Sequence, residues 1–300
     1  MTPSSMHLLS RIPSDQKRYL RSTYRKYERL FVRTFRSYGP ERLIACLRSL
    51  GIHEGDCVLL HSAFKLDNGF CGNIEALIDT FILALGKSGT LLMVSLPFRS
   101  SSYEYLSTLD CFDVRSTPSQ MGLLSEQFRR RPGVLRSLHP THPVLAYGPK
   151  ADWIVADHER CPYPCGPGTP FEKLLSLDGA VLFFDVPFST FTFVHYLEHL
   201  MRDRLPFPLY SEKVFQVPVI DHAGAHRTVA VAVFSQDAIR RRRFPLLEAE
   251  LRRRRMLREQ RLGNTQILSV HASDAVECAQ DMAQRNTFFY DLSDVFTNPS

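Results

Sequence analysis

Three short segments of the sequence combine histidine with other residues that can carry out acid–base or nucleophilic chemistry. The first is His61-Ser62, at the end of an apolar run that predicts a buried strand. The second is the segment 136–143, RSLHPTHP, in which two prolines stiffen the chain around His139. The third is the segment 195–199, HYLEH, which follows another apolar run. These segments supply the first candidate site residues.

The spacing within HYLEH supports more than one chemistry. On a helix, residues three and four positions apart share one face, so His195, Glu198 and His199 can lie together. A carboxylate beside an imidazole orients the ring and stabilises its protonated form, which makes His195 a candidate general base. The same letters form the H-x-x-E-H pattern, in which two histidines bind zinc and the glutamate polarises a metal-bound water. A buried structural network is the third interpretation, and the residues alone leave all three open.

The elements that carry these segments alternate between strands and helices. Apolar runs predict buried strands within 56–64, 89–98, 142–148 and 178–188. Helical spacing predicts helices over 40–51, 73–86, 117–130 and 191–205, and a helical tail from residue 244. Two extended runs around a glycine-containing turn predict a hairpin over 214–234. The pattern predicts an α/β fold with a mixed central β-sheet flanked by helices. Because open α/β sheets bind ligands at the carboxyl ends of their strands, His61 and Ser62 fall at a binding edge.

Two basic blocks stand out from a chain whose formal net charge is +6. Residues 14–38 place aromatic and aliphatic side chains at helical spacing, which predicts a basic amphipathic helix. We therefore divide the chain into a helical extension, 1–40, and a main domain, 41–300. The second basic block contains the arginine runs at 240–243 and 252–255, which have no interleaved aromatic residues for base stacking. We interpret both blocks as solvated helix faces and expect no nucleic-acid partner.

The composition is that of an ordinary globular protein. Of the 300 residues, 44% are hydrophobic and 23% are charged, which argues against a disordered or fibrous chain. No apolar run approaches the roughly 18 residues that span a bilayer, and the first residues do not resemble a secretory signal. The seven cysteines are scattered and odd in number, which is typical of a reducing compartment. We therefore expect a cytoplasmic protein.

Several motifs in a fixed order resemble the antibiotic acetyltransferase family that is typified by the aminoglycoside 3-N-acetyltransferases. The motifs include LLHSAF, TPSQMG, RSLHPTHP, TFVHYLEHL and RLGNTQILSV, and the resemblance covers about residues 41–300. It implies an acyltransferase that moves the acetyl group of acetyl-CoA to an amine by direct attack, with no metal. It also implies that His195 is the catalytic base, Glu198 its carboxylate partner and Thr192 a third catalytic residue. The threonine or a nearby backbone N–H could stabilise the oxyanion of the intermediate.

The resemblance also places residues around the acyl donor. Ser62 resembles a position near the acyl-CoA, and its neighbour His61 is assigned to the same cofactor-binding group. His139, in the HP element, resembles a position that lines the substrate site.

The acceptor side of the site departs from the family pattern. Ser189 and Phe191 stand where the family often has Asp and Asn, and Asp185 could supply a carboxylate from four residues earlier. Polycationic drugs favour carboxylate-rich clefts, so the acceptor is either an aminoglycoside, as in antibiotic resistance, or another small amino-sugar-like molecule. A zinc-dependent hydrolase that uses residues 195–199 and a catalytically inactive binding protein are the alternatives. The oligomeric state is left open, with a homo-oligomer as one option.

Overall fold

The structure is a computed structural model that describes residues 23, 27, 30–32, 34–65 and 67–293. Its central sheet holds seven strands, whose order along the sheet is β4 (Leu135–Arg136), β5 (Val144–Tyr147), β2 (Thr90–Val94), β1 (Cys57–Ser62), β6 (Ala180–Phe184), β10 (Thr265–His271) and β9 (Arg258–Leu262). Strands β2, β1 and β6 are parallel, whereas β5 and β10 run antiparallel to their neighbours in this group. The predicted mixed α/β sheet is therefore confirmed.

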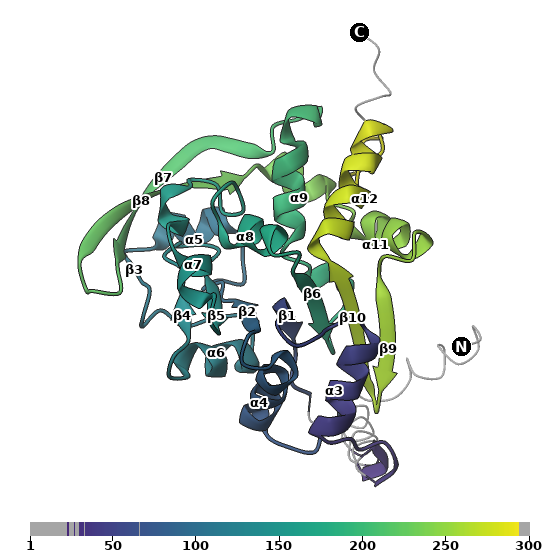
Figure 1. Cartoon of the computed structure of the whole chain (residues 1–300). Helices are drawn as coiled ribbons and strands as arrows, with labels where there is room; N and C mark the ends of the chain where they lie inside the picture. The colour runs from purple at the N-terminus through teal and green to yellow at the C-terminus, as the bar shows by residue number, and fades with distance from the viewer. Residues whose placement is uncertain (1–22, 24–26, 28–29, 33, 66, 294–300) are drawn as a thin grey trace.

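Alternate side chains of the central strands pack into two cores, one on each face of the sheet. On β1, Val58 and Leu60 belong to one core and Leu59 to the other, as the two-residue period of a strand requires. The first core lies under α3 (Pro40–Ser49), α4 (Ile74–Leu85) and α6 (Leu123–Arg130). The second lies under α7 (Ala151–Val155), α8 (Pro170–Ser176), α9 (Val194–Met201), α11 (Phe244–Arg253) and α12 (Ala272–Gln284) (Figure 1). Burial on both faces explains why these strands are apolar without interruption.

The predicted hairpin is confirmed, but it belongs to a second sheet. Strands β7 (Tyr210–Ile220) and β8 (His226–Phe234) pair antiparallel, and β3 (Phe112–Asp113) lies beside β7. This sheet projects from the main body in Figure 1 and has its own apolar core, to which α5 (Ser102–Thr108) contributes Leu106. The end of β8 returns to the main body, where Phe234 packs in the larger core.

The helix predicted over 117–130 is shorter than expected. It begins at Leu123, after Gly122, which has a φ of +111°. The preceding residues use their polar groups in loop contacts, because Thr117 accepts a hydrogen bond from the Asp113 N–H and the Ser119 N–H donates to Glu126. Residues 117–122 therefore belong to a loop, and the predicted start of the helix at residue 117 was wrong.

The predicted helical tail was also wrong in its middle part. Helices α11 and α12 are present, but residues 258–271 form the β9–β10 hairpin between them. Its turn contains Gly263 in a left-handed conformation, and the short apolar run that follows is buried in the central sheet. Such a short run cannot be assigned to a strand or a helix from its periodicity, and pairing with β6 decided the outcome.

The basic helix predicted over 14–38 lies for most of its length outside the described residues. At the end of that segment, Tyr38 is buried, and its hydroxyl group shares a 2.7 Å hydrogen bond with the Thr265 hydroxyl group. The division at residue 40 stays a prediction. Across the described part of the chain, no helix is both long and apolar enough to cross a membrane.

Most arginines of the second basic block form ion pairs within the fold. The pairs include Arg240 with Asp237, Arg243 with Asp291, Arg252 with Glu248, and Arg253 and Arg254 with Glu250. Much of this positive charge is therefore balanced locally. The interpretation of the runs as solvated helix faces was wrong for Arg242, which lies between α10 (Gln236–Arg241) and α11, is only 15% exposed and pairs with Glu198.

Candidate active site

His195 and Glu198 lie one turn apart on α9, and their side chains are hydrogen-bonded. The His195 Nδ1 atom lies 2.7 Å from the Glu198 Oε2 atom. A carboxylate oxygen at this position only accepts, so Nδ1 carries the proton and Nε2 keeps its lone pair. The His195 side chain is 16% exposed, whereas Glu198 is fully buried. The pair thus presents a basic nitrogen toward the surface while it shields the carboxylate from water.

An aromatic cluster fixes the start of α9 above strand β6. The 3₁₀ turn η2 (Phe188–Thr190) follows the strand. Phe188 stacks on Phe183 and Phe191 packs against it at a tilt, with ring centroids 5.4 and 5.6 Å from that of Phe183. These side chains are buried. The apolar run that predicts the strand therefore continues into the turn, and the packing of that turn sets the direction of the helix. The position of His195 follows from this packing.

Two residues distant in sequence hold the Glu198 carboxylate. Arg242 donates from Nε to Oε1 at 2.7 Å and from Nη2 to Oε2 at 2.8 Å. The Tyr290 hydroxyl group also donates to Oε1. Burial alone would raise the pKa of Glu198, but Arg242 and His195 lower it to about 2. The carboxylate is therefore ionised, and the sequence pattern contained no signal for either partner.

The same surroundings keep His195 neutral. Burial lowers the pKa of His195, and the positive charge of Arg242 lowers it further, while the Glu198 carboxylate opposes both effects. The net shift is downward. A histidine with a lowered pKa is unprotonated at neutral pH and can accept a proton there.

The carboxyl end of β1 meets the start of α9. The backbone N–H of Thr192 donates to the His61 Nε2 atom at 3.4 Å, and burial lowers the pKa of His61 to about 3, so this ring is neutral. The Thr192 hydroxyl group donates to the Thr190 carbonyl at 3.4 Å. Ser62 pairs with Phe184 at the end of the parallel β1–β6 ladder. The structure thus brings three of the predicted site residues, His61, Thr192 and His195, to one edge of the sheet.

The RSLHPTHP element contributes a different histidine from the one we expected. His139 is fully buried, accepts hydrogen bonds at Nδ1 from the N–H groups of Thr141 and His142, and stacks on His158 at 4.5 Å. His142, rather than His139, packs against His195, with ring centroids 5.8 Å apart. The resemblance pointed to His139, but the backbone turn decides which of the two rings faces α9, and that ring is His142.

The two acceptor-side candidates lie in different environments. Ser189 is exposed in η2. Asp185 lies at the end of β6 with a φ of +60°, is 9% exposed, and forms a 2.8 Å ion pair with the Lys65 ammonium group. The charge of Asp185 is therefore largely neutralised by a neighbour that the sequence pattern did not indicate.

The H-x-x-E-H residues do not fit a zinc site. Glu198 is fully buried, and its oxygens are bonded to His195, Arg242 and Tyr290, so it cannot polarise a metal-bound water. The His199 Nδ1 atom lies 2.9 Å from the Tyr210 hydroxyl group. In the described residues, no group of three or more His, Cys, Asp or Glu side chains is placed to hold a metal ion.

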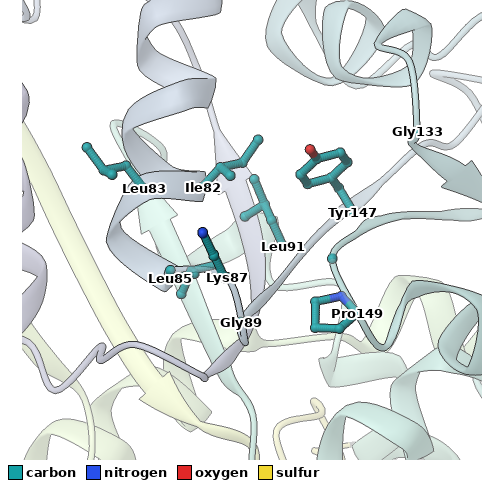
Figure 2. A pocket seen from close by; sticks show the side chains of 11 residues that line it. Ile82, Leu83, Leu85, Lys87, Gly89, Leu91, Gly133, Tyr147 and Pro149 are labelled. Atoms are coloured by element: carbon teal, nitrogen blue, oxygen red, sulfur yellow. The ribbon is translucent and has the colours of Figure 1, made fainter.

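Two cavities lie at opposite ends of the central strands. One, of about 570 Å³, is lined by the end of α4, the start of β2 and Tyr147, and Figure 2 shows its mainly apolar wall. None of the predicted site residues lines it. The other, of about 500 Å³, begins at Phe64, two residues after Ser62, and is lined also by Lys65 and the first turn of α4. The second cavity lies at the end of the sheet that carries His61 and Ser62.

A family model described as aminoglycoside 3-N-acetyltransferase matches residues 59–284. The chain belongs to this family. The match includes His61, α9 and Arg242 but ends before Tyr290. The aminoglycoside N(3)-acetyltransferase IX of Micromonospora chalcea is 29% identical over 167 residues, which are 51% of this chain and 59% of that protein. In this alignment the chain thus spans less than two thirds of its relative's length.

Solved structures of acetyltransferases have the same fold. The crystal structure of aminoglycoside acetyltransferase AAC(3)-Xa has a TM-score of 0.73 at 24% identity and covers 86% of this chain and 97% of its own. A histidine-to-alanine variant of AAC(3)-IVa, in complex with a gentamicin, has a TM-score of 0.66 at 26% identity. It covers 83% of this chain and 90% of its own. The central mixed sheet with helices on both faces is therefore the fold of these enzymes.

Proposed function

We propose that this chain transfers an acetyl group from acetyl-CoA to an amine of an aminoglycoside or another amino-sugar-like molecule. The observation that carries the proposal is the His195–Glu198 pair, which leaves the His195 Nε2 lone pair available at the edge of the sheet. Membership in a family of N-acetyltransferases supports the reaction, and the gentamicin complex of AAC(3)-IVa supports an amino-sugar acceptor.

The chemistry asks for a base because a protonated amine cannot attack a thioester. The acceptor nitrogen attacks the carbonyl carbon of acetyl-CoA, and its proton passes to the His195 Nε2 atom. The Glu198 carboxylate stabilises the imidazolium that forms. The tetrahedral intermediate then breaks its C–S bond, the CoA sulfur takes up a proton, and an amide and free CoA are released.

The donor would lie along the end of β1. The cavity of about 500 Å³ that begins two residues after Ser62 is large enough for part of an extended thioester arm. In this arrangement His61 and Ser62 form the inner end of the donor site. Thr192 is the candidate oxyanion donor. Its backbone N–H donates to His61 and its hydroxyl group donates to the Thr190 carbonyl, both at 3.4 Å, so either group would exchange a long hydrogen bond for one to the oxyanion.

The acceptor would approach His195 from the side of η2. Ser189 is exposed there, and Asp185 contributes little free charge because Lys65 is bonded to it. His139 would act on this side only through the packing of its segment, since His142 is the residue that contacts the His195 ring. Because this side of the site carries little unpaired negative charge, it favours an acceptor of low positive charge over a strongly polycationic drug.

The test is a free-thiol release assay with acetyl-CoA and a panel of aminoglycosides and amino sugars. We expect turnover by the wild-type protein and a loss of about 10² to 10⁴-fold in His195→Ala and His195→Gln, which remove the base. Acetyl-CoA binding, measured by calorimetry, should persist in both variants. His53→Gln, at an exposed position, is the matched control and should keep full activity.

Three results would contradict the proposal. Near-normal turnover in either His195 variant would show that His195 is not the general base. Acetyl-CoA binding without turnover of any amine would support the inactive binding protein instead. About one zinc per chain, lost together with activity on His199 substitution, would support the hydrolase.

A further inference from the structure

The Glu198 carboxylate uses all of its hydrogen-bonding capacity inside the protein. An ionised carboxylate offers about four acceptor sites. Here Oε1 accepts from Arg242 Nε and from the Tyr290 hydroxyl group, while Oε2 accepts from Arg242 Nη2 and from His195 Nδ1. The carboxylate is fully buried, so water does not compete for these sites. Its orientation, and with it the position of the acceptor for Nδ1–H, is fixed by these partners.

The two outer partners are themselves held together. Arg242 and Tyr290 form an antiparallel backbone bridge, flanked by hydrogen bonds from the Arg243 N–H to the Phe289 carbonyl at 2.8 Å and from the Asp291 N–H to the Arg241 carbonyl at 2.7 Å. The Arg242 guanidinium group also lies over the Phe234 ring, 4.4 Å from its centroid. The segment after α12 is thus fastened to the segment before α11, directly behind the catalytic pair.

We propose that Arg242 and Tyr290 are positioning residues for acetyl transfer, which together lock Glu198 so that His195 keeps its proton on Nδ1 and presents an unprotonated Nε2. The inference rests on the proposed function and deepens it. Neither residue needs to touch a substrate, because both act through Glu198.

The charge of Arg242 has a second effect on His195. Four groups face the His195 ring: Glu198 on α9, Arg242 before α11, His142 before β5 and His61 on β1. Three further groups lie near the Glu198 carboxylate: Tyr290 after α12, Cys165 and Tyr210. Arg242 supplies the positive charge in this set, since burial lowers the pKa values of His61 and His142 and keeps both rings neutral. Removal of that charge should therefore make His195 easier to protonate, and removal of the Glu198 charge should do the opposite.

The experiment compares four variants of the whole chain with a matched control. Arg242→Met removes the charge and both donors, Arg242→Lys keeps the charge but not the two-pronged geometry, and Tyr290→Phe removes one hydroxyl group. Glu198→Gln removes the carboxylate. The control is Arg240→Met, an exposed arginine of the same run that pairs with Asp237. Circular dichroism melting establishes that each variant is folded before its kcat/KM is measured across pH and His195 is titrated by NMR.

We expect the variants to separate charge from geometry. Arg242→Met should lower kcat by about 10 to 100-fold, as a misplaced catalytic group does. It should also move two quantities to higher pH: the midpoint of the His195 titration and the acidic limb of the kcat/KM–pH profile. Arg242→Lys should lower kcat with a smaller midpoint shift, and Tyr290→Phe should lower kcat by less than Arg242→Met does. Glu198→Gln should move the midpoint of the His195 titration and the acidic limb of the kcat/KM–pH profile to lower pH. Arg240→Met should change neither quantity.

Other outcomes overturn the inference. Folded Tyr290→Phe and Arg242→Lys proteins whose kcat stays within about twofold of wild type would show that the two residues only support the fold. If the midpoint of the His195 titration is unchanged in the folded Arg242→Met protein, the charge of Arg242 does not act on His195. If the wild-type protein transfers no acetyl group, the proposed function fails, while the NMR tautomer and midpoint of His195 still decide whether Arg242 and Tyr290 position it.

Discussion

A single ion pair at the end of β6 would decide how much negative charge the proposed acceptor meets. The Asp185 Oδ1 atom lies 2.8 Å from the Lys65 Nζ atom. Burial raises the pKa of Asp185, and the Lys65 contact opposes that shift. Ser189, by contrast, is exposed and uncharged. An added charge at position 189 would therefore face solvent and the incoming acceptor without a neutralising partner of the Lys65 type.

This difference predicts how substrate choice responds to substitution. Ser189→Asp should raise kcat/KM for a polycationic aminoglycoside by up to about fivefold, an exposed-pair magnitude of about 1 kcal/mol, and should raise it less for a mono-amino sugar. Asp185→Asn should change the ratio of the two kcat/KM values little, because Lys65 already offsets that charge. Ser49→Asp, at an exposed position on α3, serves as the control. A strong loss of aminoglycoside use in Asp185→Asn would instead assign the acceptor carboxylate to Asp185.

At the scale of elements, the β9–β10 hairpin links the carboxyl-terminal half of the chain to the segment around Tyr38. Strand β10 pairs with β6, and the Asp185 N–H donates to the Gln266 carbonyl, so the hairpin helps to shape the end of β6. Its turn residue Gly263 has a φ of +61°. A Cβ atom there would lie 2.6 Å from the Arg36 carbonyl oxygen and 2.8 Å from the Tyr38 ring.

This contact predicts that alanine is poorly tolerated at the turn. Gly263→Ala should lower the free energy of unfolding by about 1–2 kcal/mol for the left-handed backbone and by a further 1–3 kcal/mol or so for the clash. Gly168→Ala is the matched control, because Gly168 has a φ of +75° but no atom within 4 Å of its Cβ position. Urea unfolding of both variants measures the difference. Equal losses of stability would show that the hairpin moves away from Tyr38 at little cost.

At the scale of the whole molecule, buried neutral histidines link stability to pH. Burial lowers the pKa values of His61 and His158 to about 3 and those of His139 and His142 well below the usual range. His158 illustrates the cause, since its Nε2 atom donates to the Pro164 carbonyl and its Nδ1 atom lies 2.8 Å from the Ser137 hydroxyl group. A second proton would have to enter a buried, already satisfied network.

The sign of the pH effect follows from these lowered values. The unfolded chain takes up protons near pH 6.5 and the folded chain does not, so stability is complete above about pH 6.5 and is lost as the pH falls toward 3. Each such histidine should cost up to about 2 kcal/mol at pH 5. We expect the free energy of unfolding in urea to fall steeply between pH 7.5 and 5.0. His158→Gln should flatten this slope and His53→Gln should not; an unchanged free energy at pH 5.0 would contradict the prediction.

The sequence by itself determined the features that repeat locally or depend on neighbours along the chain. Apolar runs located strands β1, β2, β5 and β6, because strands buried on both faces require such runs. The three-residue spacing of His195 and Glu198 predicted their contact, because a helix places such residues on one face. The order of motifs predicted the family, and the mixed α/β sheet followed from alternating patterns.

Only the tertiary structure decided which distant groups complete the site. Arg242 and Tyr290 stand 44 and 92 residues from Glu198, and no periodicity relates them to it. The same holds for Lys65 beside Asp185 and for the choice of His142 over His139 next to His195. Local patterns report backbone geometry over a few residues, whereas a buried charge selects its partner by the spatial meeting of elements. The H-x-x-E-H letters were therefore compatible with a base or with zinc until the fold placed an arginine on the glutamate.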